Sequence, residues 1–263
     1  MASPWTVMIT PSPSMLPAEI LALVISFIKD RNDLAHLMRA SHVLSVEAER
    51  VLYSDILLTP PSLGSLDGLL DGLIAHPRRG LLVQSFLMTV DSEISHIATK
   101  INRAFRLMAN LVWLRLTAWD FDLKIIDLAD GCSFRLRRFG YSLFPVIDSS
   151  LPAFLASQPS IQHLELPHFV TELPLSDLLP NLSTVVMHVF PERALFTNRS
   201  ISRLHWCTRD KFLREPWPAL KVLRLDRLPT RFIIAPLCPD LRYLGCAFPT
   251  NAVRVLIIQE RGT

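Results

Sequence analysis

An apolar template, L-x-x-L-x-L, recurs along most of the sequence and constrains the fold more than any other feature. Its clearest copies begin at residues 111, 161, 182, 201, 220 and 241, and weaker copies begin at residues 83, 136 and 253. Successive first positions are 28, 25, 25, 21, 19, 19, 21 and 12 residues apart. A step of about 20 to 29 residues is typical of a solenoid, in which each repeat packs only on its neighbours.

The second and third apolar positions of each copy are two residues apart, so on a strand both face the same side. Stacked copies would join their leucines into one continuous core, which accounts for the 45 leucines among 263 residues. Four copies are preceded by proline, at Pro159, Pro180, Pro218 and Pro239, where it ends the preceding element. We therefore predict an α/β fold with about nine parallel strands. Helical or irregular crossings connect them, such as residues 149–156.

These copies resemble degenerate leucine-rich repeats. They lack the Asn or Cys that usually follows the last leucine of a regular repeat. The resemblance implies a leucine-rich-repeat-like solenoid with a parallel sheet on its concave face, a surface that such proteins use for binding. An ordinary α/β domain with parallel, Leu-rich strands is the alternative.

If the leucines face the core, the residues between them face outward in two rows that cross the strands. We take the aromatic and charged members of these rows as candidate substrate-binding residues: Trp113, Arg115, Arg138, His163, Glu165, Arg203, His205, Arg224 and Tyr243. Arginine outnumbers acidic residues there, which favours an acidic or phosphorylated segment as the ligand. The alternative is that these side chains simply keep an exposed surface soluble.

The N-terminal part of the chain has a helical pattern instead. Residues 17–28 form an apolar stripe at helical spacing, made of Ile20, Val24, Phe27 and Ile28, with Pro17 suited to the first turn. We expect Asp33 to cap a second short helix and Ser45 to cap a third. A unit this small buries little apolar surface, so one helix face is expected to contact a neighbour or a partner.

Over about residues 15–58, an ordered set of blocks resembles the F-box. The blocks are Leu16-Pro17-Ala18-Glu19-Ile20-Leu21, an apolar run ending at Phe27-Ile28, Asp33-Leu34, Ser41, and a tail from Ala48 to Ile56. F-boxes bind the Skp-type adaptor of cullin-RING ubiquitin ligases. The resemblance therefore implies a three-helix domain whose adaptor-facing positions are Leu16, Pro17, Ile20, Ile28 and Leu34. The sequence departs from the vertebrate pattern in lacking a Trp in the third helix. The alternative is a helical subdomain that packs on its own chain.

Together these patterns divide the chain into four parts. We predict a flexible arm at residues 1–14, an F-box helical domain at 15–58, a linking helix at 59–80, and the solenoid at 81–263. The combined resemblance implies a substrate-recognition subunit of a Skp-cullin-F-box ubiquitin ligase. Its partners would be a Skp-type adaptor, a cullin bound through that adaptor, and an unknown protein target. The alternative is a non-catalytic scaffold without a ubiquitin role.

Other classes of function have little support in the sequence. The net charge is +3, and the Arg clusters are not interleaved with aromatic residues, so we expect no nucleic-acid partner. No apolar run is long enough to span a membrane. The four cysteines, Cys132, Cys207, Cys238 and Cys246, show no metal-binding spacing. We expect reduced thiols, no membrane partner, and a cytoplasmic or nuclear location.

Catalytic motifs are also missing. The sequence contains no Gly-rich phosphate loop, no G-x-S-x-G elbow and no H-E-x-x-H pair. His163, Glu165 and His168 lie close together, but we interpret them as a polar surface patch rather than a metal site. We therefore expect no enzymatic activity, no catalytic residues, no metal and no cofactor.

Overall fold

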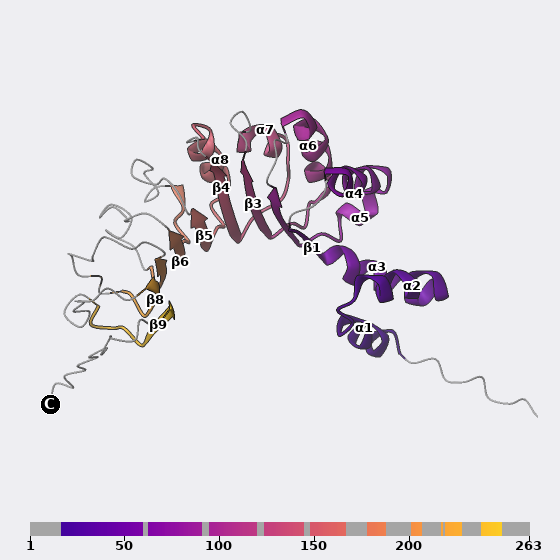
Figure 1. Ribbon diagram of the computed structural model, residues 1–263, viewed down its shortest axis with the longest axis horizontal. Coiled ribbons are helices and arrows are strands. Elements are labelled where there is room, and N and C mark those ends of the chain that lie inside the picture. Colours follow the sequence, from indigo (N-terminus) through magenta and orange to yellow (C-terminus); the bar gives the residue numbers. More distant parts are fainter. Residues whose placement is uncertain are drawn as a thin grey trace, which may run out of the picture. The chain divides into compact units, whose positions relative to one another are not determined.

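The computed structural model describes residues 17–59, 63–90, 95–119, 124–144, 148–166, 178–187, 201–206, 217, 219–227 and 238–248. The chain divides into two compact units, Met1–Ser54 and Asp55–Thr263 (Figure 1). The first unit is helical and the second alternates strands and helices. Among the described residues, no helix is both long and apolar enough to cross a membrane.

Three helices make up the first unit: α1 (Ala18–Ser26), α2 (Arg31–Ala40) and α3 (His42–Ser54). Both α1 and α2 pack against α3. One residue from each helix is fully buried, and these are Ile25, Leu34 and Ala48. Partly buried apolar residues surround them: Ile28, Leu37, Met38, Leu44, Val51 and Leu52.

The second and third helices begin earlier than predicted, and other residues cap them. The Asp30 carboxylate accepts a hydrogen bond of 2.7 Å from the Asn32 backbone N–H. The Ser41 hydroxyl accepts one of 3.2 Å from the Leu44 N–H. These short polar residues occupy the extended position before each helix, where they satisfy otherwise unpaired N–H groups. The predictions of Asp33 and Ser45 as caps were wrong, because both residues lie inside the helices.

A nine-stranded, all-parallel sheet dominates the second unit, and its strands follow one another in sequence order. The strands are β1 (Asp55–Leu58), β2 (Ser85–Val90), β3 (Trp113–Trp119), β4 (Arg138–Phe144), β5 (His163–Leu166), β6 (Thr184–Met187), β7 (Arg203–Trp206), β8 (Val222–Arg227) and β9 (Tyr243–Phe248). This arrangement confirms the predicted α/β fold with a parallel, leucine-rich-repeat-like sheet. Strands β2 to β9 each begin two residues after the first position of a template copy.

The first strand, β1, was not predicted. Residues 55–58 were assigned to the end of the helical domain, yet they pair in parallel with β2. The copy that begins at residue 253 lies outside the described residues.

Backbone hydrogen bonds fix the register where each strand begins. The Val112 carbonyl accepts from the N–H groups of both Arg137 and Arg138, and the Arg137 carbonyl accepts from those of Gln162 and His163. The same doubled contact recurs from the repeat that contains β2 to the repeat that contains β9. Each repeat is therefore held to the next before its strand starts.

Where the structure describes their side chains, the template's second and third apolar positions are buried in β3, β5 and β8, as predicted. Leu114, Leu164 and Leu223 are 0% exposed, and Leu116, Leu166 and Leu225 are at most 3% exposed. Helices cover this face of the sheet: α4 (Leu63–Ala75), α5 (Pro77–Gly80), α6 (Ala98–Leu107), α7 (Ile125–Ala129) and α8 (Leu151–Ser157), with the short 3-10 turn η1 (Ser95–Ile97) before α6 (Figure 1). Helix α4 lies in the stretch predicted to link the two domains, and it packs against α6 within this layer.

Aromatic rings fill the space between helices and sheet. Phe86 on β2 meets Phe105 on α6 edge-to-face, with 5.2 Å between ring centroids. Phe139 on β4 contacts Phe154 on α8 at 5.0 Å. The repeats that contain β2 and β4 therefore contribute aromatic side chains to the core, in addition to their leucines.

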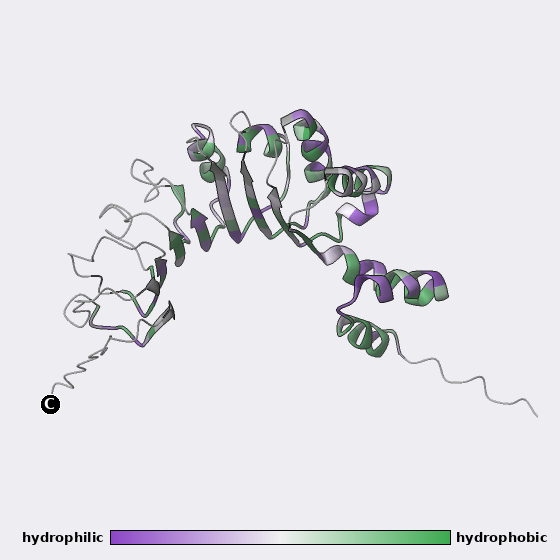
Figure 2. Cartoon of the chain, in the orientation of Figure 1, coloured by the Kyte–Doolittle hydropathy of each residue, from purple (hydrophilic) through white to green (hydrophobic). Residues whose placement is uncertain are grey.

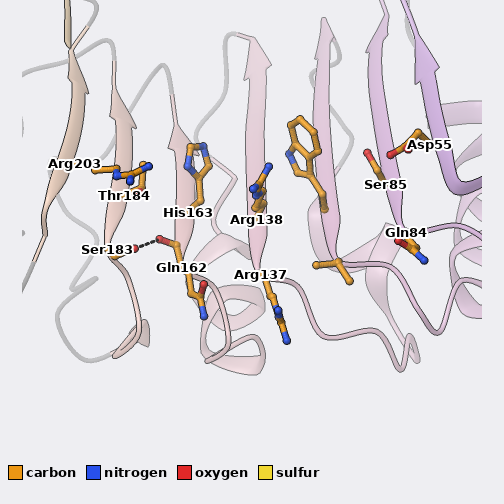
Figure 3. Close-up of a pocket in the computed structure, with 12 residues that line it drawn as sticks. Asp55, Gln84, Ser85, Arg137, Arg138, Gln162, His163, Ser183, Thr184 and Arg203 are labelled. Atoms are coloured by element: carbon orange, nitrogen blue, oxygen red, sulfur yellow. Dashed lines mark hydrogen bonds between the residues drawn. The ribbon is translucent and has the colours of Figure 1, made fainter. Parts of the chain in front are cut away.

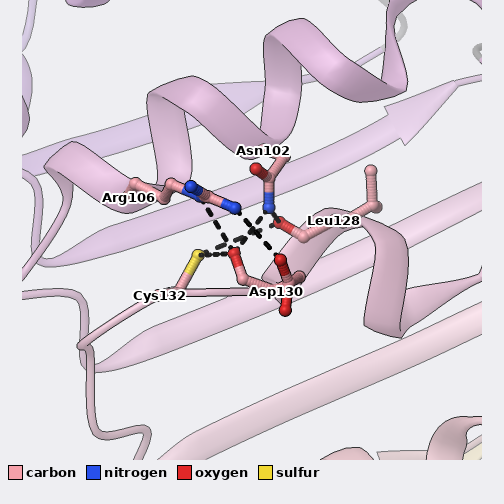
Figure 4. A network of polar contacts seen from close by, with 5 residues as sticks. All are labelled: Asn102, Arg106, Leu128, Asp130 and Cys132. Carbon is pink, nitrogen blue, oxygen red and sulfur yellow. Dashed lines mark hydrogen bonds and ion pairs between the residues drawn. The ribbon is translucent and has the colours of Figure 1, made fainter.

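Polar side chains join neighbouring repeats inside this layer. The Asn102 amide on α6 donates to the carbonyls of Leu128 and Asp130, at 3.0 and 2.9 Å, where α7 ends (Figure 4). Arg106, one helical turn later, donates to the Asp130 carbonyl and pairs with its carboxylate. Together they satisfy carbonyl groups that a helix end leaves unpaired.

Asp148 instead accepts hydrogen bonds from backbone N–H groups at the starts of two helices. It is 8% exposed, and its carboxylate accepts from the Ile125 N–H at the start of α7. It also accepts from the Ser150 N–H just before α8. The Tyr141 hydroxyl donates to the same carboxylate, and burial raises the pKa of Tyr141, with that bond adding to the rise.

Candidate binding surfaces

The sheet face opposite the helices, which we call the open face, carries two rows of side chains. Register pairing places in the first row Asp55, Ser85, Trp113, Arg138, His163, Thr184, Arg203, Val222 and Tyr243. It places in the second row Leu57, Leu87, Arg115, Gly140, Glu165, Val186, His205, Arg224 and Gly245. From β3 to β9, this register confirms that the nine candidate residues named from the sequence line up in two rows.

A groove of about 640 Å³ runs along the first row, where the strands begin. It extends from β1 to β7 and is lined by Asp55, Gln84, Ser85, Val112, Trp113, Arg137, Arg138, Gln162, His163, Ser183, Thr184 and Arg203. Figure 3 shows most of these side chains in two tiers, the first row and the residues just before each strand. The lining is mainly polar, with Val112 and Trp113 as its apolar members.

Positive charge predominates in this groove. Three guanidinium groups line it, those of Arg137, Arg138 and Arg203, whereas Asp55 is the one carboxylate among the lining residues. The Arg138 guanidinium lies over the Trp113 ring, 5.4 Å from the ring centroid. This cation–π contact restrains Arg138 without neutralising its charge.

His163 lies in the first row between Arg138 and Thr184, and Glu165 is two residues further along the same strand. Burial lowers its pKa below the usual 6.5, the nearby Glu165 carboxylate opposes this shift, and Arg138 strengthens it. The imidazole is therefore neutral at physiological pH, with one nitrogen as a donor and the other as an acceptor.

Two residues of the second row, one basic and one acidic, neutralise each other's charge. Arg115 on β3 and Glu165 on β5 form an ion pair of 2.9 Å across the intervening strand β4. Gly140 lies between them in the row, and a Cβ atom there would approach the Arg115 Cγ to 3.0 Å. A glycine at this position thus leaves room for the pair to close.

The structure separates the nine predicted substrate-binding residues into three sets. Four of them line the groove: Trp113, Arg138, His163 and Arg203. Arg115 and Glu165 pair with each other. His205, Arg224 and Tyr243 lie on the open face toward β9 and do not line the groove, although Tyr243 is 58% exposed.

Sequence reasoning missed the groove residues on β1 and those that precede each strand, such as Gln84, Arg137 and Gln162. The β1 signal was present, because Tyr53-x-x-Ile56-x-Leu58 fits the repeat template. The preceding residues directly follow the first apolar residue of each copy, at a position that the pattern leaves unspecified. Only the doubled backbone contacts place them beside the first row.

The helical unit carries a second candidate surface, on α1. Ile20, Leu23, Val24 and Phe27 are 43, 55, 53 and 71% exposed, respectively. Figure 2 shows that most of α1 consists of hydrophobic residues. Ile25 faces the unit's core, so α1 presents apolar side chains on two sides. A helix that is apolar all round is normally buried.

The predicted adaptor-facing residues fall into different environments. Pro17 and Ile20 are exposed at the start of α1. Ile28 is partly buried against the core, and Leu34 is 3% exposed within it. Leu16 lies outside the described residues. Of the described residues in this set, Pro17 and Ile20 are thus accessible at the surface, while Leu34 packs inside the helical unit.

Reactive groups are few in the part of the chain that the structure describes. Within it, no group of three or more His, Cys, Asp or Glu residues is arranged to hold a metal ion. Cys132 and Cys238 are free thiols, and burial raises the pKa of each to about 11. Such thiols are poor nucleophiles at neutral pH. Cys207, His168 and the Cys246 side chain lie outside the described residues.

No family model matches the sequence, and no curated protein matches it significantly.

Proposed function

We propose that the chain is a non-catalytic substrate-recognition subunit of a cullin-RING ubiquitin ligase. In this proposal the helical unit binds a Skp-type adaptor as an F-box. The sheet unit binds a target protein on its open face. The chemistry belongs to the associated conjugating enzyme, and this chain raises the effective concentration of a target lysine beside it.

The exposed apolar face of α1 is the observation that carries the proposal. Large apolar side chains on a small helical unit mark a protein-interaction surface when they are contiguous. Ile20 and Val24 on α1 and the C-cap residue Phe27, which keeps helical backbone angles, lie at spacings of four and three residues, so they share one side of the helix. The F-box resemblance of residues 15–58 adds the identity of the partner, because Pro17 and Ile20 lie within its first block.

The decisive experiment is co-purification of the full chain with a Skp-type adaptor. An Ile20→Ala/Val24→Ala/Phe27→Ala variant removes exposed apolar surface while leaving the core residue Ile25 in place. We expect its affinity for the adaptor to fall at least about tenfold, since each truncation removes apolar area from the contact.

A matched control removes three exposed apolar side chains from the other unit, in a Leu81→Ala/Val112→Ala/Tyr243→Ala variant. We expect this variant to retain the adaptor at the wild-type level. Equal recovery of the wild type and the α1 variant would contradict the F-box assignment. Binding to the adaptor without recruitment of a cullin would instead favour a scaffold that has no ubiquitin role.

A further inference from the structure

We propose that the groove between β1 and β7 holds an extended anionic segment that crosses the strands. One anionic group of that segment, a carboxylate or a phosphate, would sit over His163 and Thr184, between Arg138 and Arg203. This inference rests on the proposed function in one respect: it assumes that the ligand of the groove is a segment of a protein. Its test needs neither the adaptor nor a cullin.

The charges on the open face locate this site. In the second row, Arg115 is already paired with Glu165, so it has less charge to offer a ligand. In the first row, neither Arg138 nor Arg203 forms an ion pair within the described part of the chain. Asp55, the one carboxylate of the lining, lies on β1, three strands from Arg138. An anionic group is therefore favoured at the β4–β7 end.

Four adjacent strands, β4 to β7, place the side chains that would bind this anionic group. Neighbouring strands are about 4.8 Å apart, so Arg138 and Arg203 are anchored roughly 14 Å from each other. His163 and Thr184 lie between them in register. The Arg203 side chain extends toward Thr184 (Figure 3), and Trp113 restrains Arg138. Two cations can thus approach one anion from opposite sides.

The two central residues can complete the contacts. A neutral imidazole donates one hydrogen bond, and the Thr184 hydroxyl can donate another. Charge-assisted hydrogen bonds from guanidinium groups to carboxylate or phosphate are among the strongest that proteins form. The site therefore matches an oxygen-rich anion, because two guanidinium groups and two further hydrogen-bond donors line it.

The length of the groove indicates an extended ligand. From β1 to β7 there are six strand spacings, or about 29 Å, which roughly nine residues of extended chain would span. A single-stranded nucleic acid also carries negative charge, but it binds such grooves by stacking its bases on aromatic side chains. Trp113 is the one Phe, Tyr or Trp among the lining residues, and Arg138 already covers its ring.

Binding of fluorescent ten-residue peptides to the full chain tests the proposal by fluorescence anisotropy. Two anionic probes have a Gly/Ser background, one with three central Glu residues and one with a single central phosphoserine. An uncharged Gly/Ser peptide, a peptide with three central Lys residues and a ten-nucleotide oligo-dT serve as comparisons. We expect the anionic peptides to bind and the uncharged and Lys peptides not to bind. Whichever anionic peptide binds more tightly shows whether the groove prefers a carboxylate or a phosphate.

An Arg138→Gln/Arg203→Gln variant should weaken binding of the anionic peptides at least about tenfold, because it removes both charge-assisted contacts. The matched control, Arg78→Gln/Arg135→Gln, removes the same charge from exposed residues outside the groove, and it should change binding less than about twofold. Circular dichroism of both variants checks that they fold.

Three outcomes would overturn the proposal. One is equal weakening in both double variants, which indicates non-specific attraction to net charge. Another is tighter binding of oligo-dT than of either anionic peptide. The third is no binding of any anionic peptide at millimolar concentration. None of these outcomes depends on adaptor binding, so failure here is distinguishable from failure of the F-box assignment.

Discussion

His163 is the groove residue whose protonation responds to its neighbours on both rows of the open face. Burial lowers its pKa below 6.5, and two oppositely charged residues act on it in opposite directions. Because the folded protein holds this imidazole neutral, the unfolded chain binds more protons as the pH falls below 6.5. The contribution of His163 to stability is therefore present above that pH and is lost as the pH falls through its folded pKa.

We expect the His163 imidazole to titrate below 6.5 in the folded chain, as measured by NMR and assigned with a His163→Gln variant. Replacing Arg138 by Gln should raise this pKa, because a nearby cation is removed. Replacing Glu165 by Gln should lower it further, because a nearby anion is removed. Titration at 6.5, or shifts of the same sign in both variants, would contradict the placement of His163 between these residues.

At the scale of single residues, the sequence predicted which side chains face outward but not which of them interact. Alternation along a strand is enough to place Arg115, His163 and Glu165 on the open face. The ion pair of Arg115 with Glu165 depends on the register of three strands and on Gly140 between them. The sequence pattern of a single strand reveals neither the register between strands nor the need for a glycine between the paired residues.

At the scale of elements, the contact between α6 and α7 depends on Asn102, which is 9% exposed. Its amide donates two hydrogen bonds to carbonyl groups at the end of a five-residue helix. So short a helix has little stability of its own and requires tertiary contacts. We infer that Asn102 holds α7 in the helical layer.

An Asn102→Ala variant should therefore lower the free energy of unfolding by about 1–3 kcal/mol, since the Leu128 carbonyl loses the buried amide donor and the Asp130 carbonyl keeps Arg106 as a donor. Urea denaturation followed by circular dichroism measures the change. The adjacent Arg103 is exposed, so Arg103→Ala should have an effect within about 0.5 kcal/mol. Similar losses in both variants would contradict the role assigned to Asn102.

Within the helical unit, the residues at which helices begin were the part of the fold that the sequence predicted least well. Asp30 and Asp33 are both suitable caps by composition, and Ser41 and Ser45 are as well. Which of each pair caps a helix depends on where the preceding chain is extended, and that follows from the packing of α1 and α2 on α3. The strands were predicted better, because β2 to β9 each follow an apolar residue at a fixed distance.

At the scale of the whole molecule, the boundary between the two units follows from one short strand. Tyr53-x-x-Ile56-x-Leu58 fits the repeat template, but its first residue also continues the apolar side of α3. Tyr53 lies in α3, whereas Ile56 lies in β1, so one pattern belongs to two elements. The prediction that the helical domain extends to residue 58 therefore did not separate the end of α3 from β1.

The side chains of β1 allow this boundary to be tested in the full chain. Ile56 is 2% exposed and pairs in register with the buried Phe86, whereas its neighbour Leu57 is 56% exposed. An Ile56→Ala variant should destabilise the sheet unit by about 2–4 kcal/mol, because it leaves a cavity in the core. Leu57→Ala should change stability by no more than about 0.5 kcal/mol. Hydrogen exchange measured by mass spectrometry should show lost protection in residues 85–90 of the Ile56→Ala variant, with residues 18–54 unchanged. Lost protection confined to residues 18–54 would mean instead that β1 belongs to the helical unit.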